Sequence, residues 1–164
     1  LSFDDSQIRA AVSAAELPPS AEVELASQLI ARRTRVARAY LALVNAAGAF
    51  RLRDEGQGRW SLLCEDAGVA AGVREPSEVL FLMEYAYGTG SGAGAWQARG
   101  GAAPAFDLTP FAPATAAGPD DPRRYGIATL QARAPQGPEP GGRTRVHIYF
   151  APGGEPRIVG VERD

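Results

Sequence analysis

The sequence has 164 residues, of which 45% are hydrophobic and 22% charged, with a formal net charge of −2. This length is typical of one domain, and the acidic balance disfavours general nucleic-acid binding, which normally uses a basic surface. No apolar stretch approaches the ~18 residues that a membrane-spanning helix requires. We therefore expect no membrane span within the chain and no nucleic-acid partner.

Three residue types limit the chemistry available to the chain. Cys64 is its one cysteine, His147 is its one histidine, and lysine is absent. These counts exclude an internal disulfide, a zinc site built from several Cys and His ligands, a Schiff base and a P-loop. We expect no metal and no cofactor, and we expect Cys64 to be a small buried hydrophobe.

The origin of the chain is only partly readable from its sequence. All basic residues are arginine, and alanine, glycine and proline are abundant, a composition typical of bacterial genomes with high GC content. Because the first residue is Leu1 rather than methionine, we expect either a removed leader, and thus export, or a longer parent chain. The cellular location stays open.

Residues 1–48 have the pattern of two helices. Asp4, Asp5 and Ser6 can cap a short helix that ends before a Pro-Pro pair, and Ser20 can cap a longer one with Gly48 at its C-cap. Apolar residues recur at the helical period along the longer helix and form one stripe: Leu25, Leu29, Val36, Tyr40, Leu43 and Ala47.

In residues 49–87 the helical period gives way to alternation. Apolar and polar residues alternate over 50–62 around a Gly-rich turn at 54–58, which predicts a β-hairpin. Residues 78–87 fit either a helix or a third strand. We favour a strand because β-branched and aromatic residues dominate this segment.

Residues 88–124 are the irregular part of the sequence, with seven glycines, five prolines and ten alanines. Within it, residues 90–95 match a loose dinucleotide-binding pattern, but nearby glycines and a proline leave no room for the helix that this motif requires. We interpret the match as a loop. Residues 95–99 are a candidate strand, and Phe106, Leu108 and Phe111 are expected to anchor the segment to the core.

From residue 125 the chain predicts three strands, over 126–134, 143–150 and 156–163. Sequential strands with short connections usually pair as an antiparallel meander. We therefore predict a single α+β domain over residues 1–164. In it, the long amphipathic helix packs on an antiparallel sheet that ends in this three-stranded meander.

The strand at 143–150 divides its side chains between two faces. Val146, Ile148 and Phe150 are assigned to the core. The opposite face carries what we term the polar row, which includes one residue of the preceding strand: Arg143, Arg145, His147, Tyr149 and Arg133. Such a row is either the solvated outer face of an antiparallel sheet or a surface on which arginine forks bind an anion or a partner.

Two single residues are further candidates. Histidine is suited to proton transfer near neutral pH, but no carboxylate stands at a fixed spacing from His147, and we assign no catalytic residue. Arg33 lies inside the apolar stripe of the long helix. It is either an arginine whose stem covers the core while its guanidinium reaches solvent, or one paired at the helix–sheet junction with Glu84 or Asp66.

These observations predict a non-catalytic binding or assembly domain that uses the polar row, in an exported or larger protein. We expect a protein partner or self-association rather than a small-molecule ligand. The alternative is a small-pocket enzyme or small-molecule-binding domain in which a helix and a curved sheet enclose His147 or Tyr149.

Overall fold

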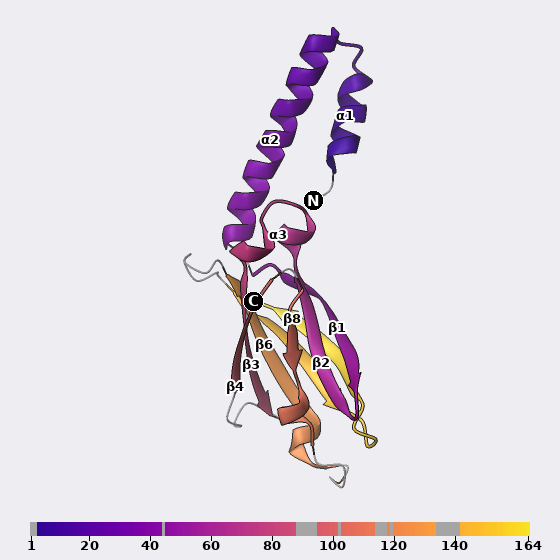
Figure 1. The fold of residues 1–164 in the computed structure, drawn as a ribbon, viewed down its shortest axis with the longest axis vertical. Coiled ribbons are helices and arrows are strands. Elements are labelled where there is room, and N and C mark those ends of the chain that lie inside the picture. Colours follow the sequence, from indigo (N-terminus) through magenta and orange to yellow (C-terminus); the bar gives the residue numbers. More distant parts are fainter. Residues whose placement is uncertain are drawn as a thin grey trace.

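In the computed structural model, two antiparallel sheets pack face to face as a β-sandwich, and a helical hairpin stands on one end of it (Figure 1). The predicted α+β class is confirmed, with its long helix and its antiparallel meander. The structure describes residues 3–43, 45–87, 95–101, 103–113, 118, 120–133 and 142–164. The glycine-rich pattern predicted as a loop at residues 90–95 lies almost entirely outside the described residues.

The hairpin consists of α1 (Asp5–Ser13) and α2 (Pro19–Leu43). Of the three capping candidates, Asp4 caps α1: its side chain accepts a hydrogen bond from the backbone N–H of Gln7, whose side chain accepts one from the backbone of Asp4. A short helix, α3 (Ala67–Ala70), lies between the hairpin and the sandwich (Figure 1). Among the described residues there are also three single 3-10 turns: Pro76–Glu78, Thr109–Phe111 and Pro122–Arg124.

The long helix ends earlier than predicted, because Asn45 binds the sheet. The Asn45 side chain donates to the Leu130 carbonyl at 2.7 Å and accepts from the backbone N–H of Ala132 at 2.9 Å. These bonds satisfy strand-end backbone groups and turn the chain into the first strand. Gly48, the expected C-cap, is therefore already a strand residue.

The smaller sheet has three strands in the order β1 (Ala47–Gly56), β2 (Arg59–Asp66) and β5 (Ala105–Asp107). The predicted β-hairpin is confirmed as the antiparallel pair β1–β2. The sequence did not predict β5, a short edge strand that pairs with β2 around Leu62 and Phe106.

The larger sheet has five strands in the order β4 (Ala95–Gly100), β3 (Leu80–Tyr87), β6 (Tyr125–Arg133), β7 (Thr144–Phe150) and β8 (Pro156–Arg163). The meander β6–β7–β8 is confirmed. The preference for a strand near residues 78–87 is confirmed by β3, and the candidate strand near residues 95–99 by β4.

The core lies between the two sheets. Val146, Ile148 and Phe150 point inward from β7, as predicted, and the three expected anchors of the irregular segment are also buried: Phe106, Leu108 and Phe111. Cys64 is buried in the same core, and this burial raises the pKa of its thiol to about 12.

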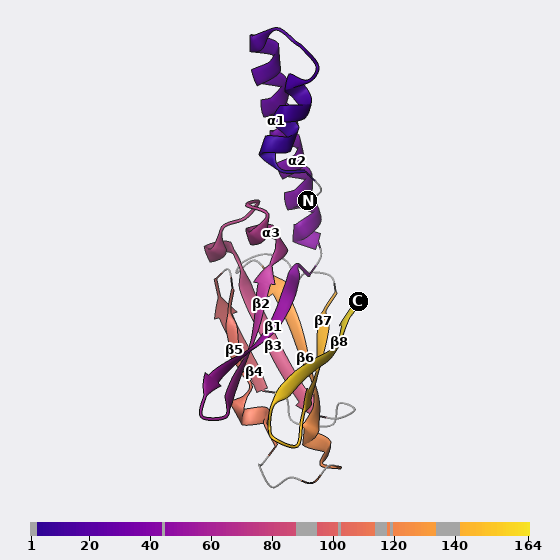
Figure 2. The same cartoon turned by 90° about the vertical axis from the view of Figure 1, so that its right-hand side faces the viewer.

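The position of the long helix differs from the sequence-based expectation. α2 does not lie along a sheet face; it extends away from one end of the sandwich, and the three-stranded sheet covers the inner face of the larger sheet instead (Figures 1 and 2). At its base, Arg38 donates to the Val73 carbonyl and Arg74 donates to the Leu41 carbonyl, each at 2.6 Å. Neither α2 nor any other described helix is long and apolar enough to cross a membrane.

Candidate functional site

The polar row lies on the outer face of the five-stranded sheet. Arg145, His147 and Tyr149 alternate with the core residues of β7, and Arg133 of β6 is half-buried on the same face. Arg143 is exposed just before β7 and lines a hollow beside Tyr40, at the base of α2. The structure therefore brings four of the five side chains onto one sheet face and sets Arg143 at its helical end.

The charge of Arg145 is already neutralised within the chain. Its guanidinium makes a two-pronged contact with the carboxylate of Asp164, at 2.9 and 3.0 Å, and lies 3.9 Å from a carboxylate oxygen of Glu162. An external anion would have to compete with these carboxylates for the arginine fork. The local geometry therefore favours an internally paired surface at this point.

His147 is held between two groups that the sequence analysis did not identify. Its Nδ1 forms a hydrogen bond with the Tyr125 hydroxyl, and its Nε2 lies 3.5 Å from a carboxylate oxygen of Glu162. The side chain is 15% exposed, and its ring lies over Gly160. The bond to Tyr125 orients the imidazole, whereas its Nε2 forms no hydrogen bond with any described residue.

Strand register explains why these two partners were missed. Tyr125 and Glu162 are diagonal neighbours of His147 on the two adjacent strands. The residue directly opposite Tyr125 is Tyr149, and the residue directly opposite Glu162 is Arg145. A β-bulge in β8 beside His147 changes the pairing, so that Gly160 lies opposite the histidine. Sequence spacing does not reveal a bulge, although Glu162 and Gly160, two residues apart in β8, share one face of the strand.

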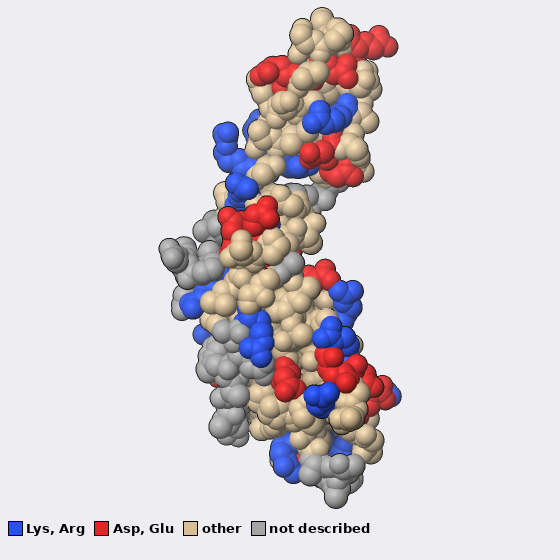
Figure 3. Space-filling view, viewed as in Figure 1, with Lys and Arg blue, Asp and Glu red and all other residues tan. Residues whose placement is uncertain are grey.

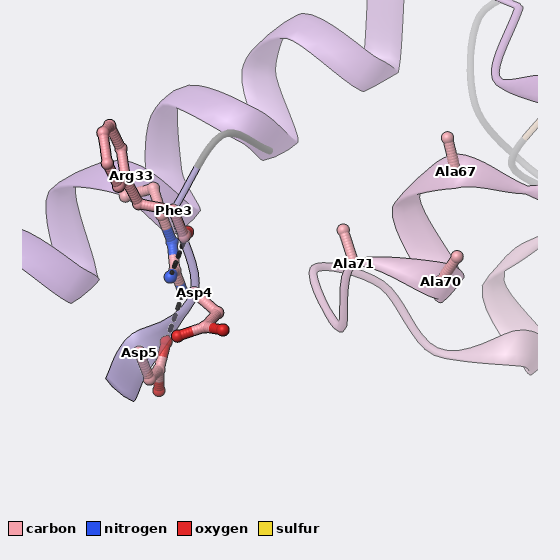
Figure 4. Close-up of a pocket in the computed structure, with 7 residues that line it drawn as sticks. All are labelled: Phe3, Asp4, Asp5, Arg33, Ala67, Ala70 and Ala71. Carbon is pink, nitrogen blue, oxygen red and sulfur yellow. Dashed lines mark hydrogen bonds and ion pairs between the residues drawn. The ribbon is translucent and has the colours of Figure 1, made fainter. Parts of the chain in front are cut away.

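Arg33 belongs to the hairpin and not to the polar row. Its guanidinium forms an ion pair with Asp5 at 2.6 Å and donates to the Phe3 carbonyl at 3.0 Å (Figure 4). Neither of the expected partners is used: Asp66 pairs with Arg74 at 3.2 Å, and Glu84 lies on β3 of the larger sheet. Arg33 thus fastens α1 to α2.

Figure 4 also shows a cleft between the base of the hairpin and α3. Phe3, Asp5 and Arg33 lie on its hairpin side, and Ala67, Ala70 and Ala71 form the opposite wall. The alanines offer no polar side-chain group to a ligand. On the other side Arg33 is paired with Asp5, and the Asp4 carboxylate accepts hydrogen bonds from Ser6 and Gln7, so this cleft presents little specific chemistry.

A largely apolar hollow lies along the hairpin itself and is termed the hairpin groove. It has a volume of about 880 Å³ and is open to solvent along one side of the two helices. Its main apolar lining residues come from both helices and the segment before α1: Phe3, Ile8, Val12, Leu25, Leu29, Val36 and Tyr40. Sequence analysis found the α2 stripe but assigned it to the core of the protein.

The exposure of this stripe is the unusual feature of the surface. Val36 is 62% exposed and Tyr40 63%, whereas the buried hydrophobic residues of the hairpin are only Val12, Ala26 and Ala37 among those described. A contiguous exposed apolar surface is uncommon on a protein that acts alone, and often marks an interaction site.

Comparison of the chain with protein-family models, curated proteins and solved structures found no match. Among the described residues, no group of three or more His, Cys, Asp or Glu side chains is placed to hold a metal ion.

Proposed function

We propose that this protein is a binding or assembly domain whose hairpin groove receives an apolar helical surface of a protein partner. The observation that carries this proposal is the exposed α2 stripe on a hairpin that projects from the sandwich (Figure 2). The core between the two sheets forms without these side chains, so folding of the sandwich does not explain their apolar character. An amphipathic helix that lies in an apolar groove would bury them.

A protein partner fits the groove better than a small molecule does. Small-molecule sites enclose most of their ligand and carry a few convergent polar groups. The hairpin groove is open along its length, and its polar lining residues are Gln7, Arg32 and Arg33, of which Arg33 is paired with Asp5. Such a surface suits shape-matched apolar packing over several helical turns.

The polar row is a second candidate binding surface with less support. Its central residue, Arg145, is paired with Asp164, and His147 with Tyr125. A pocket that encloses His147 or Tyr149 is likewise less well supported, because both side chains lie on the outer sheet face. The three hollows described above do not include them in their linings.

Site-specific photo-crosslinking in the cells that make the protein tests the binding role. A photoreactive amino acid in place of Val36 should give a discrete adduct whose partner peptide is an apolar helix. The matched control replaces Val23, which is on the same helix and 63% exposed but does not line the groove. Equal labelling from both positions, or none from position 36, would contradict the proposal.

A companion experiment separates the two candidate surfaces. Leu29→Gln in the chain that carries the photoreactive residue should abolish the adduct, because it places an amide in the centre of the groove. Arg145→Glu should leave the adduct unchanged. If Arg145→Glu abolishes the adduct and Leu29→Gln does not, the polar row is the binding surface.

A further inference from the structure

We infer that the hairpin groove binds the hairpin of a second copy of this chain, in an antiparallel arrangement with two-fold symmetry. This inference rests on the proposed binding role of the groove and names its partner. Two such hairpins would form a four-helix bundle, in which the exposed stripes of both copies become the inner seam. Two independent observations support a second copy: the spacing of the stripe and the distribution of charge along α2.

The intervals between the apolar residues of the stripe are the same in both directions along α2. Leu25, Leu29, Val36 and Tyr40 are separated by four, seven and four residues, intervals that keep side chains on one helix face. With a two-fold axis between positions 32 and 33, Leu25 lies opposite Tyr40 of the second copy and Leu29 opposite Val36. The stripe is therefore complementary to itself, as a symmetric dimer interface requires.

The charges of α2 favour the antiparallel direction. Glu22 and Glu24 lie in the outer half of α2, whereas Arg32 and Arg35 lie in the half nearer the sandwich; Arg38 is already bonded to the Val73 carbonyl. Figure 3 shows acidic side chains gathered at the outer end of the hairpin. An antiparallel partner brings the acidic end of one helix toward the basic half of the other. A parallel partner would set both Arg32 and Arg35 level with their counterparts, where like charges repel each other, whereas the antiparallel partner separates the two copies of Arg35 by about 7 Å along the axis.

Arg32 marks the centre of this arrangement. It lines the groove at the edge of the apolar stripe, close to where the symmetry axis would pass. The two copies of Arg32 would approach each other there and weaken the dimer. Arg32→Leu should therefore tighten self-association by at least about tenfold, because it removes a like-charge contact and extends the apolar seam.

Sedimentation equilibrium of the purified full chain measures the association. The unaltered chain should show a reversible dimer, and Val36→Gln should weaken it by at least about tenfold, since each substitution acts twice in a symmetric dimer. Val23→Gln, the matched control, should leave the dissociation constant unchanged. A chain that stays monomeric up to about 1 mM, or a dimer insensitive to Val36→Gln, would overturn the inference.

Engineered cysteines test the direction. In the antiparallel dimer a cysteine at position 25 faces one at position 40, whereas two copies of position 25 lie about 22 Å apart along the axis, too far for a disulfide. A mixture of Leu25→Cys and Tyr40→Cys chains should form a mixed disulfide dimer, while either chain alone should not. Cys64 is buried and should not interfere. Disulfides formed by each chain alone would indicate a parallel dimer and overturn the antiparallel assignment.

The two proposals fail separately. A photo-crosslinked adduct at position 36 with a different protein, together with a monomeric purified chain, would retain the binding role and reject the second copy as partner. An absence of both the adduct and the dimer would reject both proposals.

Discussion

Asp66 is a carboxylate with no exposed surface, and its two oxygens serve different groups. One accepts hydrogen bonds from the backbone N–H groups of Gly68 and Val69, at 2.7 and 3.0 Å, and so caps α3. The other pairs with Arg74, which in turn donates to the Leu41 carbonyl. This single side chain therefore connects the end of β2 to the base of α2.

Asp66→Ala should lower the free energy of unfolding by about 3 kcal/mol. The substitution removes the cap and leaves the Arg74 guanidinium largely buried without its carboxylate. Glu65→Ala is the matched control, because Glu65 forms a more exposed ion pair with Arg51 and should cost less than about 1 kcal/mol. Urea denaturation measures both values. Equal losses for the two variants would contradict the role assigned to Asp66.

Two neighbouring tyrosines give a second comparison at this scale. Tyr85 is fully buried and stacks on Phe111, and its hydroxyl has no hydrogen-bond partner among the described residues. The Tyr87 hydroxyl donates to the Pro110 carbonyl at 3.3 Å. Tyr85→Phe should leave stability unchanged or raise it by up to about 1 kcal/mol, whereas Tyr87→Phe should lower it by about 0.5 kcal/mol. Thermal denaturation distinguishes them, and a clear loss for Tyr85→Phe would show that its hydroxyl is bonded.

At the residue scale, sequence reasoning succeeded where the signal is local. Alternation along β7 placed Val146 inside and His147 outside, because a strand sends successive side chains to opposite faces. It could not identify Glu162 as a neighbour of His147. That contact depends on strand pairing and on a bulge, both of which are set by the whole sheet.

At the scale of elements, the attachment of α1 to α2 depends on few buried side chains. Arg33 contributes an ion pair with Asp5 and a hydrogen bond to the Phe3 carbonyl. Arg33→Met keeps the stem of the side chain and removes both contacts. We expect hydrogen exchange of the α1 amides to accelerate about fivefold, which corresponds to about 1 kcal/mol of local stability.

The control for this experiment is Arg35→Met, which changes an exposed arginine of the same helix. It should leave α1 exchange unchanged, and neither variant should alter exchange in β6 or β7. If Arg35→Met accelerates α1 exchange as much as Arg33→Met does, net charge and not the Asp5 contact holds the helix.

The elements themselves were predictable to different degrees. Capping by Asp4 and the alternation around Phe50 gave α1 and the β1–β2 hairpin correctly. The end of α2 was missed because Asn45 ends it through bonds to Leu130 and Ala132, which lie more than eighty residues away. Three residues around Phe106 are too few for a periodic signal, so β5 was missed as well.

At the scale of the whole molecule, the position of α2 could not be derived from its pattern. A helix with an apolar stripe at Leu29 and Val36 looks the same whether that stripe faces a sheet, a neighbouring helix or a partner. The sandwich resolves the choice for this chain, because its two sheets cover each other's inner faces. The apolar stripe of α2 therefore lines the hairpin groove and does not pack on a sheet.

Because the hairpin lies outside the sandwich, changes in the two parts should affect the reactivity of the buried Cys64 thiol differently. Burial raises the pKa of Cys64 to about 12, so at pH 8 only about one thiol in 10⁴ is ionised, and the side chain is also shielded by the core. Labelling of Cys64 by a thiol reagent should therefore require opening of the sandwich, and its rate should follow the opened fraction.

Asp66→Ala, if it costs about 3 kcal/mol, should accelerate labelling about 100-fold. Val36→Gln in the groove should leave the rate unchanged at concentrations where the chain is monomeric. Equal acceleration by both variants would mean that the hairpin and the sandwich unfold as one unit. A polar substitution in the groove would then also destabilise the core.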